Sequence, residues 1–328
     1  MFFFLLLIVP LVAWWAPWIG SHDSGLPIDL LRQAAASLLF FFNGMQLASL
    51  QRPACSRLLT KQVGLSLVGS FLFFPLMTYA TFSLLHFPPT YWRGLLFLSL
   101  LPTTTNSCIA FCQMAGGPLL PPLLVAIIGN GSAILLLPLL LPYALGIGAQ
   151  ADPLSFLHPF LLLMALLLLP LWVGWVVARW HPISIRLSEQ CDRLGRLLLV
   201  YIIYTAYCTS FLTLKNSQGQ ELELLFSLLS SLTLLLLLSL LLAALMAWVW
   251  QVDRETRLIW LFTMPQKSVV VGVPLASLLM EAGGGIGEGS ANWSSLVLPL
   301  LLYNNVQNIV STCLAYALSS SSDEQKKL

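Results

Sequence analysis

One lysine lies within a stretch of sequence that is otherwise largely apolar. Lys267 sits inside the run 258–280, with Pro265 two residues before it and Gln266 and Ser268 on either side. A charge at bilayer depth costs at least ~2.5–3.5 kcal/mol, so it persists only beside a partner or in a polar cavity. A proline among polar residues in such a run is typical of the interrupted helices that line the sites of secondary transporters.

A second segment has the same design. Pro102 is followed by the polar run Thr103-Thr104-Thr105-Asn106-Ser107, and the apolar stretch ends at Ala115-Gly116-Gly117, as the first ends at Ala282-Gly283-Gly284. Proline removes a backbone donor and crowds the preceding turn, and the freed groups must face protein or water. We expect both helices to break and to meet near the midplane. The alternative is two ordinary proline kinks with threonines bonded to their own backbone. The side chains expected at the site are Thr105, Asn106, Ser107, Gln266, Lys267 and Ser268.

Amide side chains at depth could complete such a site. Asn304, Asn305, Gln307 and Asn308 cover most of a helical turn, so they cannot all face lipid. Residues four apart share a helix face, which pairs Asn304 with Asn308. We expect this cluster and Asn130 to line a cavity. The alternative, which weighs equally for Asn43, is that buried amides serve only as hydrogen-bond partners between helices.

The elements that position these residues must be membrane helices. The chain of 328 residues is 58% hydrophobic and 9% charged, whereas soluble domains carry about 25% charge. A span needs about 20 apolar residues. The segments that meet this requirement are about 2–20, 28–50, 61–85, 92–115, 119–145, 157–179, 193–214, 226–250, 256–281 and 293–318. We therefore expect an all-α integral membrane protein with ten transmembrane helices, the first of them retained rather than cleaved as a signal peptide.

Basic residues orient these spans. Eleven lysines and arginines fall in the loops and the tail of one side, three (Arg32, Arg93 and Lys215) fall on the other, and Lys267 is the remaining one. This asymmetry predicts that both termini are cytosolic. The interrupted spans are fourth and ninth, each fourth in a group of five, so the two groups enter the membrane from opposite sides. We expect one membrane domain over 1–328, built of inverted repeats at about 1–146 and 157–318, with a cytosolic tail at 319–328.

Several functions are disfavoured by what the spans lack. The span centres contain no aspartate or glutamate, and the four histidines fall at span ends or in loops. Proton exchange on buried carboxylates, metal-dependent proteolysis and serine–histidine chemistry therefore lack their residues, and we expect neither an enzyme nor a metal or cofactor site. The basic residues are dispersed, so we expect no nucleic-acid partner.

Motifs spread over most of the chain carry a family resemblance. They are Phe40–Leu47, Leu101–Ser107 with Ala115–Gly117, Gly129-Asn130 ahead of Pro138, Tyr201–Cys208, Gln266-Lys267-Ser268 with Gly272–Pro274, and Pro299–Tyr303. In these stretches the chain resembles the bile acid:sodium symporter (SBF-like) superfamily, and within it the branch of sodium/bile acid cotransporter 7. The resemblance implies two inverted five-helix repeats, a panel and a core domain, and crossed helices four and nine in the core.

The resemblance also implies ion ligands, with departures. Asn106, Ser107, Asn130 and Gln266 match positions that hold sodium in the bile acid members. An expected glutamate falls at Phe262, a second hydroxyl falls at Ala126, and Lys267 replaces an asparagine. Two unit charges a few ångströms apart repel by several kcal/mol at an effective dielectric near 20. Either Lys267 is a built-in cation that replaces one sodium, or the buried amine loses its proton during the cycle; an anionic solute could also pair with it.

The sequence thus predicts a secondary transporter of an organic, anionic solute with its site where helices four and nine cross. Cation coupling is possible in principle, but Lys267 opposes a neighbouring sodium ion. The partners implied are a small organic solute and the lipid bilayer. The alternative, drawn from the animal members of the branch, is a non-transporting membrane regulator of calcium homeostasis.

Overall fold

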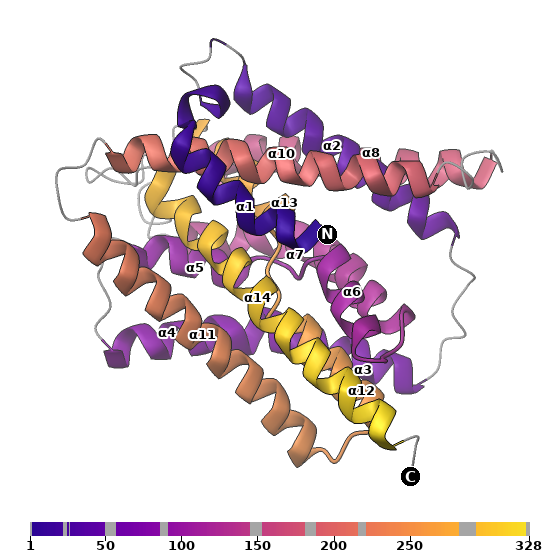
Figure 1. Ribbon diagram of the computed structural model, residues 1–328. Coiled ribbons are helices and arrows are strands. Elements are labelled where there is room, and N and C mark those ends of the chain that lie inside the picture. The colour runs from indigo at the N-terminus through magenta and orange to yellow at the C-terminus, as the bar shows by residue number, and fades with distance from the viewer. Residues whose placement is uncertain are drawn as a thin grey trace. The chain divides into compact units, whose positions relative to one another are not determined.

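The computed structural model describes residues 2–21, 25, 27–49, 57–85, 91–144, 153–180, 188–215, 221–281 and 293–325. Within these ranges every regular element is a helix (Figure 1). The chain divides into two compact units, and each unit draws on both halves of the sequence.

The first unit comprises Met1–Ala54, Leu145–Glu221 and Val270–Leu301. Its helices α2 and α8 approach so closely that a Cβ on Gly44 or Gly174 would lie 2.0 Å from a backbone oxygen of the other helix. Small residues at such contacts let helix backbones pack directly, which is a common basis of helix association in membranes. The elements of this unit are α1 (Phe2–Trp15), η1 (Pro17–Gly20), α2 (Ile28–Ser49), α8 (Pro153–Trp180), α10 (Ser188–Lys215) and α13 (Val269–Glu281).

The second unit comprises Cys55–Ala144, Leu222–Val269 and Leu302–Leu328. Its elements are α3 (Arg57–Val68), the π-helical turn η3 (Gly69–Phe73), α4 (Phe74–Leu85), α5 (Trp92–Leu100), α6 (Asn106–Met114), α7 (Leu120–Ala144), α11 (Glu221–Val249) and α12 (Arg254–Thr263). The last helix, α14 (Trp293–Gln325), begins in the first unit and ends in the second. It continues seven residues beyond the predicted span end at 318, through Ser319 to Gln325.

Length and hydropathy mark several of these helices as membrane-compatible. Three stretches among the described residues are long and apolar enough to cross a bilayer: Leu59–Ser83, Arg193–Leu212 and Leu225–Val249. Two shorter apolar helical stretches are Leu120–Ala133 and Leu168–Trp180.

Two helical segments of the chain are interrupted where the prolines predicted it. Helix α5 ends at Leu100 and α6 begins at Asn106, while α12 ends at Thr263 and α13 begins at Val269. We call the intervening residues 101–105 the first break and residues 264–268 the second break. The first interrupted segment also ends near its glycines, because α6 stops at Met114 and Gly116 has a φ of 78°. The corresponding stop at Ala282–Gly284 lies outside the described residues.

Candidate functional site

The first break arises because the backbone leaves the helix one residue before Pro102. Leu101 is extended, with φ −66° and ψ 149°, as expected for a residue that precedes proline. The carbonyls at the end of α5 therefore lose the donors that a continuing helix would supply. The next helix starts with Thr105 at its N-terminal boundary.

The second break is entirely buried. Residues 264–268 are all buried, and the side chains of Gln266 and Lys267 are completely buried. The π-helical turn η3 packs directly on this break, since a Cβ on Gly69 would lie 2.6 Å from Sδ of Met264. The freed peptide groups of the second break have no access to water and must find partners within the protein.

The two breaks are joined to each other by several hydrogen bonds. The backbone N–H of Ser268 donates to the carbonyl of Pro102 at 2.8 Å, and the hydroxyl of Thr104 donates to Oε1 of Gln266 at 3.1 Å. The side chain of Lys267 adds bonds from the second break to the end of α5, described next. The breaks therefore form one continuous polar centre within the second unit.

The ammonium group of Lys267 is held by oxygen atoms on three sides. Nζ donates to the carbonyls of Ser99 at 2.8 Å, Leu101 at 2.9 Å and Ser70 at 3.0 Å. The Ser70 hydroxyl lies 3.3 Å away, and the ring centroid of Phe74 lies 4.3 Å away. An ammonium has three N–H donors, so these carbonyls engage all of them. The position at the C-terminal end of α5 also places the cation where the helix dipole favours it.

Helix α14 satisfies further peptide groups of the second break. The side-chain amide of Gln307 accepts from the backbone N–H of Lys267 at 2.9 Å and donates to its carbonyl at 3.1 Å. Tyr303 donates to the carbonyl of Pro265 at 2.7 Å, and Ser311 accepts from Nε2 of Gln266 at 2.9 Å. These three residues are spaced by four, so they form one stripe along the helix. The stripe supports the broken backbone.

Other amides of the second unit have hydrogen-bonding atoms without a protein partner. Asn308 is 3% exposed, and neither Nδ2 nor Oδ1 of its side chain has a partner. Asn304 accepts from Gln307 at 3.3 Å but its Nδ2 has no partner. Asn130 donates to the hydroxyl of Thr105 at 3.3 Å, while its Oδ1 has none. Buried polar atoms without protein partners are rare, so these amides are the groups of this centre that can bind a solute or water.

The other predicted residues are less well placed. Ser107 is 7% exposed in the first turn of α6, and Ser268 contributes its backbone to the tie between the breaks. Asn106, matched by resemblance to an ion ligand, begins α6 with an exposed side chain. Asn305 is half-buried and lies two residues from Gln307, on a different face of α14.

Sequence analysis did not single out the ligands of the lysine. Ser70 and Ser99 contribute mainly backbone carbonyls, which carry no signature in the sequence. Gln307 was predicted as one member of a polar cluster, but its specific role as the partner of the Lys267 peptide groups was not. A lysine in an apolar stretch does signal that acceptors must exist, without saying which.

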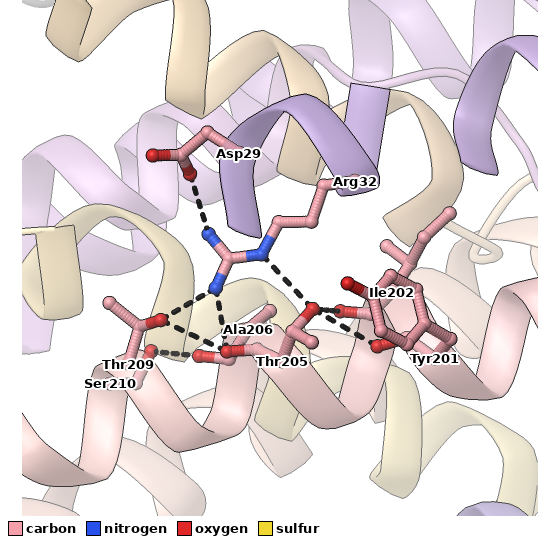
Figure 2. Close-up of polar contacts among 8 residues, drawn as sticks. All are labelled: Asp29, Arg32, Tyr201, Ile202, Thr205, Ala206, Thr209 and Ser210. Atoms are coloured by element: carbon pink, nitrogen blue, oxygen red, sulfur yellow. Dashed lines mark hydrogen bonds and ion pairs between the residues drawn. The ribbon is translucent and has the colours of Figure 1, made fainter. Parts of the chain in front are cut away.

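A second buried cation is Arg32, which lies within the predicted span 28–50 and was counted there only among the charges that orient the spans. It lies in α2 with a fully buried side chain. Figure 2 shows its guanidinium between Asp29 and helix α10: Nη1 pairs with Asp29 at 3.0 Å, Nε donates to the Thr205 hydroxyl at 3.0 Å, and Nη2 donates to the Thr205 carbonyl at 2.7 Å and the Thr209 hydroxyl at 2.6 Å. The ion pair one turn away and these acceptors make burial tolerable. This network joins α2 to α10 within the first unit.

The described residues contain no group of three or more histidine, cysteine or acidic side chains that could hold a metal ion. The same part of the chain places no carboxylate within ion-pair distance of Lys267. The polar centre therefore combines one uncompensated buried cation with neutral amides and hydroxyls.

Comparison with known proteins assigns the whole chain to a family. The model of the SBF-like CPA transporter family matches residues 1–320, almost the whole chain. The chain belongs to the SBF-like CPA transporter family. It is a family of transporters rather than of enzymes, and together with the apolar helices this identifies an integral membrane protein.

Two relatives of this family member match over most of their length. The uncharacterized protein PA2026 of Pseudomonas aeruginosa is 28% identical over 315 residues, covering 93% of this chain and 89% of the relative. The protein of Escherichia coli (strain K12) named "Putative symporter YfeH" is 26% identical over 291 residues, covering 87% of this chain and 83% of the relative.

Proposed function

We propose that this family member is a secondary transporter of a small organic, anionic solute, which binds beside the two joined breaks. The observation that carries the proposal is the pairing of two interrupted helices with buried amides that have no partner. Interrupted helices whose freed backbone lines a polar centre are how secondary transporters build their sites. The family and the printed name of the Escherichia coli relative support the same class of function.

The proposed charge of the solute follows from Lys267. Its ammonium is surrounded by carbonyls and a hydroxyl, with no carboxylate among the described residues to neutralise it. A unit negative charge ~8 Å away would be attracted by ~2 kcal/mol at an effective dielectric of ~20. The solute need not touch the lysine, because the unused N–H groups of Asn304 and Asn308 can donate to it directly.

The proposed architecture completes this picture. It has ten transmembrane helices in inverted repeats over about 1–146 and 157–318, within one membrane domain, and helices four and nine cross at the breaks. It is supported by the way each compact unit takes parts from both halves of the chain. Cytosolic termini, and membership of the branch of sodium/bile acid cotransporter 7 on the strength of Gln266-Lys267-Ser268, belong to the same proposal.

A stability screen tests the transport function. Purified wild-type protein and Asn308→Leu would be melted in the presence of organic anions, each matched with its neutral amide analogue. We expect at least one anion to raise the melting temperature of the wild type saturably, with a smaller shift for the neutral analogue and for Asn308→Leu. That anion should then exchange across proteoliposomes containing the wild type. An anion that binds but shows no counterflow would refute transport.

A second candidate is a non-transporting membrane regulator. The observation that favours it is the full engagement of the Lys267 ammonium within the protein, which suits a static scaffold. A stoichiometric protein partner that co-purifies with the chain, together with no exchange of any screened solute, would support this function over transport.

A further inference from the structure

The oxygen atoms around the Lys267 ammonium belong to parts of the chain other than the lysine's own segment. We call them the oxygen cage: the carbonyls of Ser70, Ser99 and Leu101 with the Ser70 hydroxyl. They come from η3 and from the end of α5, and the ring of Phe74 in α4 covers one side at 4.3 Å. Because the cage is mostly backbone, replacement of the lysine would leave its acceptors in place.

These carbonyls are available for identifiable reasons. The carbonyls of Ser99 and Leu101 lie at the end of α5, where the chain turns away from the helix and the N–H groups of Thr103 and Thr105 do not continue the helical pattern. The carbonyl of Ser70 lies in a π-helical turn, a feature found frequently at functional sites. The contact between Gly69 and Met264 holds this turn against the second break.

The cage selects for a cation. Its three carbonyls can only accept hydrogen bonds or coordinate a positive ion, and the Phe74 ring face also attracts cations. A water molecule or a neutral amine has only two N–H or O–H donors and would leave one buried carbonyl without a partner. A ring of carbonyl oxygens is how channels replace the hydration shell of a monovalent cation.

We propose that the oxygen cage is a monovalent-cation site that prefers a primary ammonium, and that Lys267 is its tethered occupant. The centre then carries its own tethered cation and needs no dissolved sodium ion in the cage. This inference concerns what fills the cage and goes beyond the proposed solute transport, so it can be tested whether or not any solute is known.

Chemical rescue tests the cage. Lys267→Ala keeps Cβ and removes the rest of the side chain, and the missing part has the shape of n-propylammonium. The melting temperature of purified Lys267→Ala would be measured with increasing n-propylammonium chloride. Controls are tetramethylammonium chloride, which lacks N–H groups, sodium chloride at equal ionic strength, and 1-propanol, which lacks the charge. Lys61→Ala, at an exposed position in α3, is the matched variant.

We expect n-propylammonium to raise the melting temperature of Lys267→Ala saturably and by several degrees, and to leave the wild type and Lys61→Ala unshifted. Tetramethylammonium, sodium and 1-propanol should not reproduce the shift. Equal responses to all the salts, an equal response of the wild type, or a saturable sodium response of the wild type would overturn the proposal. None of these readouts depends on transport, so failure here leaves the proposed function to its own test.

A second variant decides the matter if Lys267→Ala cannot be purified. Lys267→Met fills the space of the side-chain stem but supplies no charge. We expect it to melt well below Lys61→Met, or to yield no folded protein where Lys61→Met does. A Lys267→Met protein as stable as Lys61→Met would show that the cage needs no cation and would refute the assignment.

Discussion

Two neighbouring amides on α14 should differ in how much stability the protein loses when each is replaced by an apolar residue of similar size. Gln307→Met removes two hydrogen bonds to the backbone of Lys267 and one to Asn304, and it leaves a buried N–H and a buried carbonyl without partners. Asn308→Leu removes no hydrogen bond, since neither side-chain atom of Asn308 has a partner. Both residues are buried in the same turn of the helix.

The expected magnitudes follow from these contacts. The cost of Gln307→Met in unfolding free energy can be estimated from two contributions. A hydrogen bond contributes a net ~0.5–1.5 kcal/mol, and a buried group left without a partner costs ~1–3 kcal/mol. Hydrogen bonds between membrane helices average only ~0.6 kcal/mol, which moves the expectation toward the low end. We therefore expect Gln307→Met to lower the free energy of unfolding by about 2–4 kcal/mol. Asn308→Leu should change it by less than about 1 kcal/mol, or raise it.

The assay is reversible unfolding of the purified variants in mixed micelles, followed by the loss of helical circular dichroism as denaturing detergent is added. The comparison between the two variants removes effects common to any substitution in α14. Equal destabilisation by both would mean that Asn308 is as fully bonded as Gln307. If Gln307→Met left the free energy of unfolding unchanged, the second break would not depend on its hydrogen bonds to Gln307. Either result would refute the division of this helix into supporting and uncommitted amides.

Three further predictions concern stability. Arg32→Lys should destabilise the protein by about 2–4 kcal/mol, because an ammonium cannot reproduce the guanidinium bonds to Asp29, Thr205 and Thr209. The control, Arg257→Lys at an exposed position, should leave the melting temperature unchanged. Equal melting temperatures of the two variants would count against the buried network. Gly69→Ala should lower the stability by about 1–3 kcal/mol, because the new Cβ would meet Sδ of Met264 at 2.6 Å. If that contact is the cause, the double variant Gly69→Ala/Met264→Ala should lose less stability than the sum of the two single variants. Asp253→Ala should lower the stability by about 0.5–2 kcal/mol, because it removes the side-chain cap on the backbone N–H of Thr256 at the start of α12. Asp253→Asn should retain most of this stability. An equal loss in both variants would contradict the capping role.

The breaks were predictable because proline acts locally. Pro102 and Pro265 each remove a backbone donor whatever the rest of the chain does, and a break lies at each of them. The extended backbone expected before a proline is seen at Leu101, whereas Met264 stays helical. The need for acceptors around Lys267 followed from the cost of a buried charge. Which acceptors serve it did not, because peptide carbonyls are the same at every position and only the π-helical turn and the end of α5 expose those of Ser70, Ser99 and Leu101.

The inward position of Arg32 was not predicted, for a related reason. Four residues into an apolar helix, an arginine can extend toward the interface or turn inward, and the sequence pattern does not distinguish these. Its inward position depends on Thr205 and Thr209, which lie far away in the chain and are brought opposite it by the packing of α2 on α10. The amides of α14 show the same limit. The sequence indicated a polar cluster, but only the structure shows that the side chain of Gln307 is hydrogen-bonded while that of Asn308 is not.

The tie between Pro102 and Ser268 has an evolutionary consequence. Donor and acceptor are both peptide groups, so exchange of either side chain leaves this bond intact unless proline replaces Ser268 and removes the N–H. Drift in side-chain identity, such as separates this chain from relatives 26–28% identical to it, can therefore proceed around the junction without dissolving it. Homologues can therefore differ in the solute they recognise and still keep this backbone hydrogen bond. A protein engineer can likewise replace most of the neighbouring side chains and retain it.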